Sequence, residues 1–323
     1  MTRVTASAPG KVVLSGEYAV LHGAPAVCMA VDRRAIVSVT SVETSWNSVT
    51  SAGYTSGEGR FVCRDAEVEW LQGKDDFRLV DAAFQVLDRT ADACVSIELD
   101  TRAFFDELCN AKIGLGSSAA LTVALSAALT QSDDVVDDAM QIHRRFQSGA
   151  GSGVDIATAV HGGLLEFRMN GAKISPLGWP KGLAYRLVWT GVPASTESKL
   201  SRFEGAGHRR SRDALVNAAT RMAAAWRSAS EVLGEFPGYI DTLRDFSEDY
   251  ELGIFDAGHD RLVAESRSAG LIYKPCGAGG GDVGILLGTN DEQLDEFLAD
   301  NPMSGCRVFE SNLETQGVTW GQH

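Results

Sequence analysis

The sequence predicts an α+β protein made of two domains. Strand-like and helix-like segments are mixed along the chain, without the regular βαβ alternation of a doubly wound sheet. The length of 323 residues suits two domains of ordinary size. Residues 170–183 contain Pro176, Pro180 and three glycines, so we expect the boundary there and place the domains at residues 1–180 and 181–323.

The N-terminal half is expected to mix strands with short helices. Runs rich in β-branched residues and alanine predict strands, at 12–14, 26–30, 35–42, 94–99 and 164–168. Apolar residues at helical spacing predict helices, over 77–88, over 117–129, around 140–146 and after Gly153. The acidic stretch 132–139 should favour the start of the third of these helices. The polar segment 43–76 is expected to be a loose hairpin or excursion.

The C-terminal half is expected to be mixed in the same way. Strands are predicted at 185–189, 270–273, 283–288 and 306–309. Helical patterns occur around 210–232, 237–249, 254–268 and 291–300.

The chain is acidic, with 29 Lys and Arg against 43 Asp and Glu and a formal net charge of -14. This balance argues against a nucleic-acid partner, which requires basic patches, but one or two local cations can still hold a phosphorylated substrate. No apolar stretch approaches the length of a membrane span, and no secretory signal is visible. We therefore expect a cytoplasmic protein with no membrane partner and with free cysteine thiols. The sequence does not indicate whether the chain is a monomer or a homodimer.

Glycine is abundant, with 34 residues, and much of it is clustered. The clusters lie at 114–116, 149–153, 162–163 and 277–281. Glycine is needed where φ is positive or where the backbone must approach a ligand closely. The clusters therefore predict ligand-binding loops rather than flexible linkers.

The segment KIGLGSSAAL at 112–121 carries the strongest chemical signal. A loop of glycine and serine that leads into a helix presents free N–H groups and a positive dipole end, which together suit a phosphate. It is not a P-loop, because no GK[ST] ends the glycine run. The hydroxyls of Ser117 and Ser118 could hold Mg²⁺ or a phosphate oxygen. A plain helix N-cap would explain one of the two serines equally well.

Asp155 and Lys11 are candidate catalytic residues. Asp155 follows the glycine loop 149–153 in the first turn of a predicted helix, where it could orient a substrate group or simply stabilise the helix N-terminus. Lys11 follows Pro-Gly at the start of a strand and could neutralise phosphate charge, although most lysines are ordinary surface residues.

The segment KPCGAGGGDVGILL at 274–287 places four glycines in five residues before a buried strand, so its backbone can pass close to a ligand. Asp282 could bind a group or cap the turn, and Cys276 is expected to be a small buried thiol. The six histidines show no metal-binding spacing, and a hydrolase triad lacks support because no G-x-S-x-G occurs.

Taken together, PGK…SGEYAV near the start, GLGSSAA in the middle and GAGGGD near the end resemble the three signature motifs of the GHMP kinases. This family of small-molecule kinases includes galactokinase, homoserine kinase, mevalonate kinase and phosphomevalonate kinase. The order and spacing of the motifs are similar along nearly the whole chain. GEY at 16–18, GSGVDIATAVHGG at 151–163 and WTGVPAST at 189–196 look most like the phosphomevalonate kinase branch.

The resemblance implies an N-terminal domain like the second domain of ribosomal protein S5 and a ferredoxin-like C-terminal domain, with the active site between them. It implies ATP and Mg²⁺ as cofactors, Asp155 and Lys11 as catalytic residues, and Ser118 as a Mg²⁺ contact. The implied nucleotide-binding residues are Lys112, Gly114, Leu115, Gly116, Ser117, Ser118 and Ala119. The implied acceptor-binding residues are Lys11, Glu17, Tyr18, Ser152, Gly153, Ser195, Thr196, Gly277, Ala278 and Gly279.

The activity that the resemblance implies is phosphoryl transfer from ATP to mevalonate 5-phosphate, a step of isoprenoid precursor synthesis. The accepting oxygen is already ionised near neutral pH, since the second pKa of such a phosphate is about 6. Asp155 is then expected mainly to orient groups and balance charge, with Lys11 bridging the anions in the transition state. The alternatives are a mevalonate kinase or another GHMP kinase acting on a hydroxyl, a decarboxylase of the same superfamily, and an inactive sensor.

Overall fold

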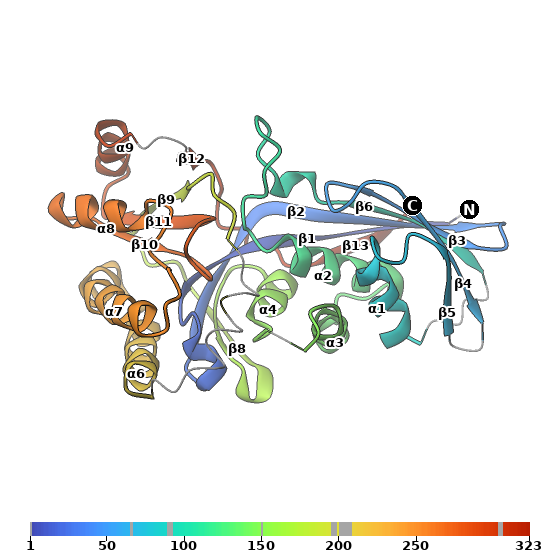
Figure 1. The fold of residues 1–323 in the computed structure, drawn as a ribbon, viewed down its shortest axis with the longest axis horizontal. Helices are drawn as coiled ribbons and strands as arrows, with labels where there is room; N and C mark the ends of the chain where they lie inside the picture. Colours follow the sequence, from blue (N-terminus) through green and yellow to red (C-terminus); the bar gives the residue numbers. More distant parts are fainter. Residues whose placement is uncertain are drawn as a thin grey trace.

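The computed structural model describes residues 2–64, 67–88, 93–149, 151–194, 199, 209–302 and 306–323. Figure 1 shows an elongated molecule with one sheet toward each end. Among the described residues the larger sheet has nine strands and the smaller has four, and helices pack against both. The predicted α+β class is therefore confirmed. No helix in this described part is long and apolar enough to cross a bilayer.

Two long antiparallel strands, β1 (Arg3–Ser15) and β2 (Ala26–Val42), form the middle of the larger sheet. Its order is β13-β1-β2-β6-β3-β4-β5, and β7 pairs with β2 and β8. The other members are β3 (Asn47–Ala52), β4 (Glu58–Arg64), β5 (Glu67–Gln72), β6 (Cys94–Asp100), β7 (Leu164–Arg168), β8 (Lys173–Leu177) and β13 (Thr319–Gln322). The short strands predicted at 12–14, 26–30 and 35–42 are thus parts of two long ones, and a register shift at Pro9/Gly10 marks an irregularity between them.

The segment 43–76, expected to be a loose hairpin or excursion, instead contains β3, β4 and β5, which extend the sheet. Only a few of its side chains are apolar, and Val49 and Phe61 are fully buried. The Phe61 ring packs 4.8 Å from that of Trp70. The strands are polar because most of their side chains remain outside the core, which is why hydrophobic periodicity did not reveal them.

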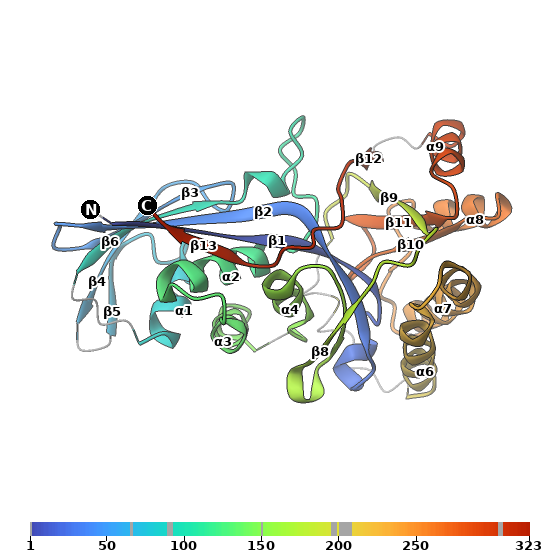
Figure 2. The same ribbon diagram turned by 180° about the vertical axis from the view of Figure 1, so that it is seen from behind.

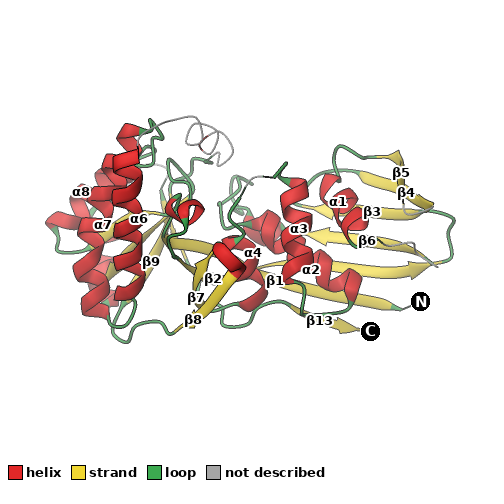
Figure 3. Cartoon of the chain, turned by 90° about the horizontal axis from the view of Figure 1, so that it is seen from below, coloured by secondary structure: helices red, strands yellow, loops and turns green. Residues whose placement is uncertain are grey.

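One face of this sheet is covered by α1 (Arg78–Val86), α2 (Ser117–Thr130), α3 (Val136–Phe146) and α4 (Val154–His161), as Figures 1 and 3 show. Helix α2 packs directly on β1 and β2 and is itself flanked by the other three helices. Its residues are small and nearly all buried, which a helix enclosed on every side requires. The four helices predicted in this half are confirmed.

The smaller sheet is antiparallel throughout, in the order β10-β11-β9-β12. Its strands are β9 (Ala184–Trp189), β10 (Ile272–Pro275), β11 (Val283–Gly288) and β12 (Arg307–Phe309). The helices of this half are α6 (Arg209–Ala225), α7 (Ala229–Asp249), α8 (His259–Ser268) and α9 (Asp291–Asp300). The chain passes from the larger to the smaller sheet between β8 and β9, and Figure 2 shows it returning so that β13 lies beside β1.

The sequence predicted two helices over 210–232 and 237–249, but the structure places the break between them earlier in the chain, between α6 and α7. The break lies before Ser228, whose side chain caps α7 by accepting a hydrogen bond from the Glu231 N–H at 3.3 Å. Pro237, the first residue of the second predicted pattern, lies inside α7, and its neighbours Phe236 and Tyr239 are fully buried. The stabilisation of α7 by the Ser228 cap and by its buried face is larger than the cost of a proline inside the helix.

A buried ion pair joins the two halves of the molecule. Lys274 of β10 donates to Glu17, which follows β1, and both side chains are almost inaccessible to solvent. The Tyr239 hydroxyl donates to the second Glu17 oxygen at 2.7 Å and accepts from the Gly16 N–H at 2.8 Å. Every polar atom of the Glu17 carboxylate thus has a partner from the C-terminal half.

We expect Lys274→Met to destabilise the protein strongly. Removal of one partner from a buried pair leaves an uncompensated charge and costs about 3–5 kcal/mol of unfolding free energy, measurable by chemical denaturation. The matched control is Arg267→Met, which breaks a pair with Asp241 in which both side chains are more than half exposed. That change should cost about 0–1 kcal/mol. Equal losses for the two variants would contradict the buried-pair assignment.

Candidate active site

A cavity of about 520 Å³ lies between the two halves of the molecule. Its walls come from the end of β1, from α3, from the start of α4 and from the glycine loop after β10. The predicted residues among its lining are Lys11, Glu17, Tyr18, Ser152, Gly153, Asp155, Gly277 and Ala278. Residues that are far apart in the sequence therefore converge on one site.

Lys11 and Asp155 face each other in this cavity. The Lys11 Nζ lies 3.4 Å from the Asp155 Oδ1, because β1 and the first turn of α4 are neighbours. Burial on its own would lower the pKa of Lys11, but the carboxylates of Asp155 and Asp282 outweigh it and hold that pKa above its usual value. The ammonium is therefore charged throughout the neutral range.

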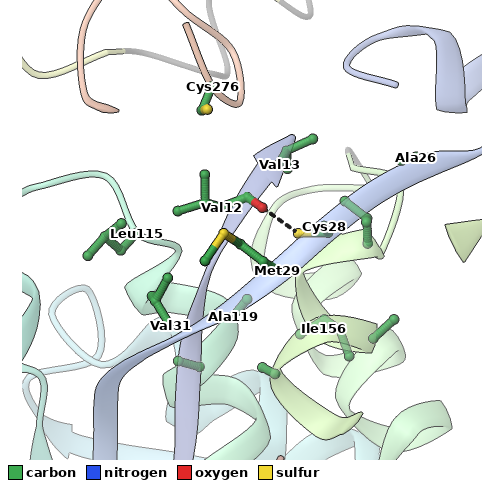
Figure 4. Close-up of a cluster of buried hydrophobic side chains, with 14 of the residues drawn as sticks. Val12, Val13, Ala26, Cys28, Met29, Val31, Leu115, Ala119, Ile156 and Cys276 are labelled. Atoms are coloured by element: carbon green, nitrogen blue, oxygen red, sulfur yellow. Dashed lines mark hydrogen bonds between the residues drawn. The ribbon is translucent and has the colours of Figure 1, made fainter. Parts of the chain in front are cut away.

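Beneath the site lies a buried hydrophobic cluster, shown in Figure 4, where Val12, Met29, Ala119 and Ile156 come together from β1, β2, α2 and α4. Cys28 lies in this cluster and donates to the Val12 carbonyl at 3.2 Å. Burial raises the pKa of Cys28 to about 12, and it does the same for Cys276. Both thiols are protonated and inert, as expected for Cys276.

The loop before α2 has the geometry of an anion site. Gly114 and Gly116 have positive φ values of 93° and 76°, and no side chain caps the helix at Gly116. The N–H groups of the first helical turn, including those of Ser117, Ser118 and Ala119, therefore have no capping partner and point toward the loop. Leu115 is buried in the core and anchors the loop, while its carbonyl accepts from the Lys11 N–H at 2.8 Å.

His143 is a site residue that the sequence did not reveal. Its Nε2 lies 3.3 Å from the Ser118 Oγ, and its ring lines the cavity one helical turn after Met140. Burial lowers the pKa of His143; Asp155 opposes this shift and Lys11 adds to it, so the ring is neutral at neutral pH. The sequence does show a histidine one helical turn after Met140 on an amphipathic helix. This pattern is equally typical of an ordinary histidine in a protein core, so it did not identify a site residue.

The glycine loop 277–281 forms the opposite wall. Tyr18 donates to the Ala278 carbonyl at 2.8 Å, which ties this loop to the segment after β1. His259 supports the loop from behind. Its Nε2 lies 3.0 Å from the Gly281 carbonyl, and its Nδ1 lies 2.9 Å from the Tyr273 hydroxyl. Burial lowers the pKa of His259 to about 4, so this support is a neutral histidine.

Two of the predicted acceptor-binding residues, Glu17 and Gly279, have surroundings that differ from direct acceptor binding. The Glu17 carboxylate is occupied by Lys274 and Tyr239. Gly279 packs against Ile254, and its carbonyl accepts from Lys199 at 2.6 Å. Ser195 and Thr196 lie outside the described residues. Lys112 is exposed at the rim of the site, where it interacts electrostatically with Asp282.

Arg78 and Arg144 form the outer wall of the cavity and were also missed by sequence reasoning. They come from α1 and α3, and the Arg78 guanidinium lies 5.6 Å from the centre of the Phe146 ring. Both side chains are exposed, and within the described part of the chain neither forms an ion pair. No local motif marks them, because only the packing of α1 against α3 brings them together.

The oxygen donors of the site fit Mg²⁺ in the way that nucleotide-binding enzymes hold it. Within the described ranges no group of three or more His, Cys, Asp and Glu could hold a metal ion alone. Mg²⁺ is usually bound by one or two protein oxygens together with substrate phosphates. The Ser118 hydroxyl and the Asp155 carboxylate, which both lie next to His143, are the donors available for this role.

Comparisons with known proteins agree with this geometry. A family model described as GHMP kinases N terminal domain matches residues 78–163. The phosphomevalonate kinase of Streptomyces sp. strain CL190 is 28% identical over 335 residues, covering 87% of this chain and 88% of that protein. The mevalonate kinase of Bos taurus is 27% identical over 390 residues, covering 97% of this chain and 93% of that protein.

The solved structure of Streptococcus pneumoniae phosphomevalonate kinase in complex with phosphomevalonate and AMPPNP superposes with a TM-score of 0.77 at 17% identity, covering 95% of this chain and 99% of that one. The two chains therefore share a fold. Residues 78–163 are similar to the N-terminal domain of the GHMP kinases, and the expected fold is confirmed.

We expect Gly116→Ala to impair catalysis through Lys11. A Cβ at Gly116 would lie 2.8 Å from the Lys11 Cε, so the ammonium must move, and misplacement of a reacting group by about 1 Å can cost roughly a hundredfold in rate. The control is Gly182→Ala, which has a similar φ of 79° but open space around it. Both variants should lose about 1–2 kcal/mol of stability from left-handed backbone strain. A normal kcat/KM for Gly116→Ala would rule out this role.

Proposed function

We propose that this protein transfers the γ-phosphoryl group of ATP to the phosphate of mevalonate 5-phosphate, giving mevalonate 5-diphosphate and ADP. The observation that carries this proposal is the pair Arg78 and Arg144, which have no ion-pair partner in the described chain and line the same cavity as Lys11. In a chain of net charge -14, cations left free beside a cavity point to an anionic ligand. The name of the Streptomyces relative and the ligand bound in the similar structure support the same acceptor, whereas the Bos taurus relative supports the alternative, a mevalonate kinase.

The charge balance inside the cavity favours a phosphorylated acceptor over mevalonate. Its cations are Lys11, Arg78 and Arg144. Of its two carboxylates, Glu17 is neutralised by Lys274, so only Asp155 remains to balance them. Mevalonate brings a single carboxylate, whereas its 5-phosphate brings about two further negative charges. The surplus of positive charge therefore matches the phosphorylated compound.

The proposed reaction needs little acid–base chemistry. An ionised phosphate oxygen of the acceptor attacks the γ-phosphorus, the bond from that phosphorus to the β,γ-bridging oxygen breaks, and ADP leaves with the electron pair. Lys11 lies between the acceptor cavity and the anion site before α2, where its charge stabilises the oxygens that are transferred. Asp155 holds the Lys11 ammonium in place. Mg²⁺, when bound, would reduce the charge repulsion between the two phosphorylated substrates.

An acceptor screen tests this proposal directly. With ATP and Mg²⁺, we expect ADP release and a new diphosphate signal in ³¹P NMR with mevalonate 5-phosphate, and no turnover with mevalonate. Turnover with mevalonate alone would instead show a mevalonate kinase. Release of CO₂ would show a decarboxylase, and absence of turnover with every acceptor would favour an inactive sensor. Magnesium dependence and a cytoplasmic location belong to the same proposal.

We expect Arg78→Met and Arg144→Met to raise KM for mevalonate 5-phosphate by about ten- to a hundredfold each, since a hydrogen bond between charged groups contributes about 1.5–3 kcal/mol. KM for ATP should change little. Arg145→Met is the matched control, because this exposed neighbour on α3 does not line the cavity. An unchanged acceptor KM in both cavity variants would remove the main support for a phosphorylated acceptor.

A further inference from the structure

Asp282 lies where the glycine loop 277–281 meets the loop before α2. Gly114, the first glycine of the loop before α2, leaves the space that the Asp282 carboxylate fills: a Cβ at Gly114 would overlap that carboxylate. Asp282 also borders a small cavity together with Lys11 and Gly114. A polyphosphate bound along the loop 114–118 would therefore lie close to a negative side chain.

The Asp282 side chain is held firmly in this place. The backbone N–H of Asp282 donates to the Val192 carbonyl at 2.7 Å, and the backbone carbonyl of Asp282 accepts from the Thr190 N–H at 2.9 Å. The Oδ1 atom accepts from the Ala194 N–H at 3.1 Å. The backbone φ is 54°, a left-handed conformation that Asp and Asn tolerate better than most residues. The carboxylate therefore has little freedom to swing away when a ligand binds.

Three lysines surround Asp282 electrostatically, namely Lys11, Lys112 and Lys199. The pKa of Asp282 is raised above its usual value because burial outweighs the Ala194 N–H and the three lysines, which partly oppose the shift. None of the lysines comes within ion-pair distance of it among the described residues, so the carboxylate is not neutralised by a direct partner. Its charge remains available to act on a ligand.

We propose that Asp282 selects the metal-bound form of the nucleotide, by repelling a metal-free polyphosphate at the loop 114–118 more strongly than one whose charge a divalent cation has reduced. Metal-free ATP carries about four negative charges and its Mg²⁺ complex about two, so one fixed carboxylate penalises the metal-free form more. Asp282 is thus a specificity-determining residue. This inference rests on the nucleotide half of the proposed function and does not depend on the acceptor.

Asp282→Asn separates charge from shape. An asparagine keeps the acceptor for the Ala194 N–H and tolerates the same backbone conformation, so the loop should keep its structure while the charge is lost. Asp256→Asn is the control: it makes the same change in net charge at an exposed residue in the segment before α8, and it lines neither cavity.

Calorimetry measures the affinity for ATP and for inorganic triphosphate, each titrated in excess Mg²⁺ and in EDTA, without acceptor. The ratio of the two affinities gives the preference for the metal-bound over the metal-free ligand. We expect Asp282→Asn to lower this preference for the metal-bound form by about tenfold, mainly through tighter binding in EDTA, and Asp256→Asn to leave it unchanged. The triphosphate should show the same change as ATP, because the effect does not involve the base.

An unchanged ratio in Asp282→Asn would overturn the inference. Weaker binding of Mg²⁺–ATP with unchanged binding in EDTA would also overturn it, since that result identifies Asp282 as a metal ligand. If the wild-type protein bound neither form of ATP, both this inference and the proposed function would fall. If it bound ATP but did not transfer phosphate to mevalonate 5-phosphate, only the proposed acceptor would fall.

Discussion

The placement of one charged lysine, Lys11, is the constraint on which the rest of the site depends. Its ammonium is largely buried, so it needs carboxylates nearby, and Asp155 lies 3.4 Å away. Its backbone N–H is bonded to Leu115, and Gly116 leaves room for its side chain. Gly10 leaves room for the Leu115 carbonyl, since a Cβ there would lie 2.7 Å from it. One strand thereby fixes the distance between the anion-binding loop and the acceptor cavity.

Much of this organisation could be predicted from the sequence. The glycine clusters identified three loops that do converge, because glycine at positive φ, as at Gly114 and Gly116, is a local requirement that a sequence shows openly. The helices α1 to α4 followed from apolar spacing. The return of the chain to β13 was not predictable, since the pairing of Thr319–Gln322 with β1 is a long-range contact with no local pattern.

The residues that sequence reasoning missed share a physical reason. His143, Arg78 and Arg144 belong to helices whose own sequences explain them as ordinary amphipathic faces. Their role arises only where α1, α3 and α4 pack together around the cavity. Glu17 shows the reverse case: its motif suggested substrate contact, but burial placed it against Lys274, where it joins the two halves instead.

These charges bear on how an acidic protein could bind the two anionic substrates of the proposed reaction. At the junction of its halves Glu17 neutralises Lys274, so that lysine adds no field to the cleft. Lys11, Arg78 and Arg144 line the larger cavity, while on the other side of Lys11 the Asp282 carboxylate lies among Lys11, Lys112 and Lys199. In the proposed reaction a phosphorylated acceptor meets a cationic cavity, whereas the nucleotide meets an anion site in which one fixed carboxylate disfavours its metal-free form. That one carboxylate would then distinguish the nucleotide site from the acceptor cavity within the same cleft.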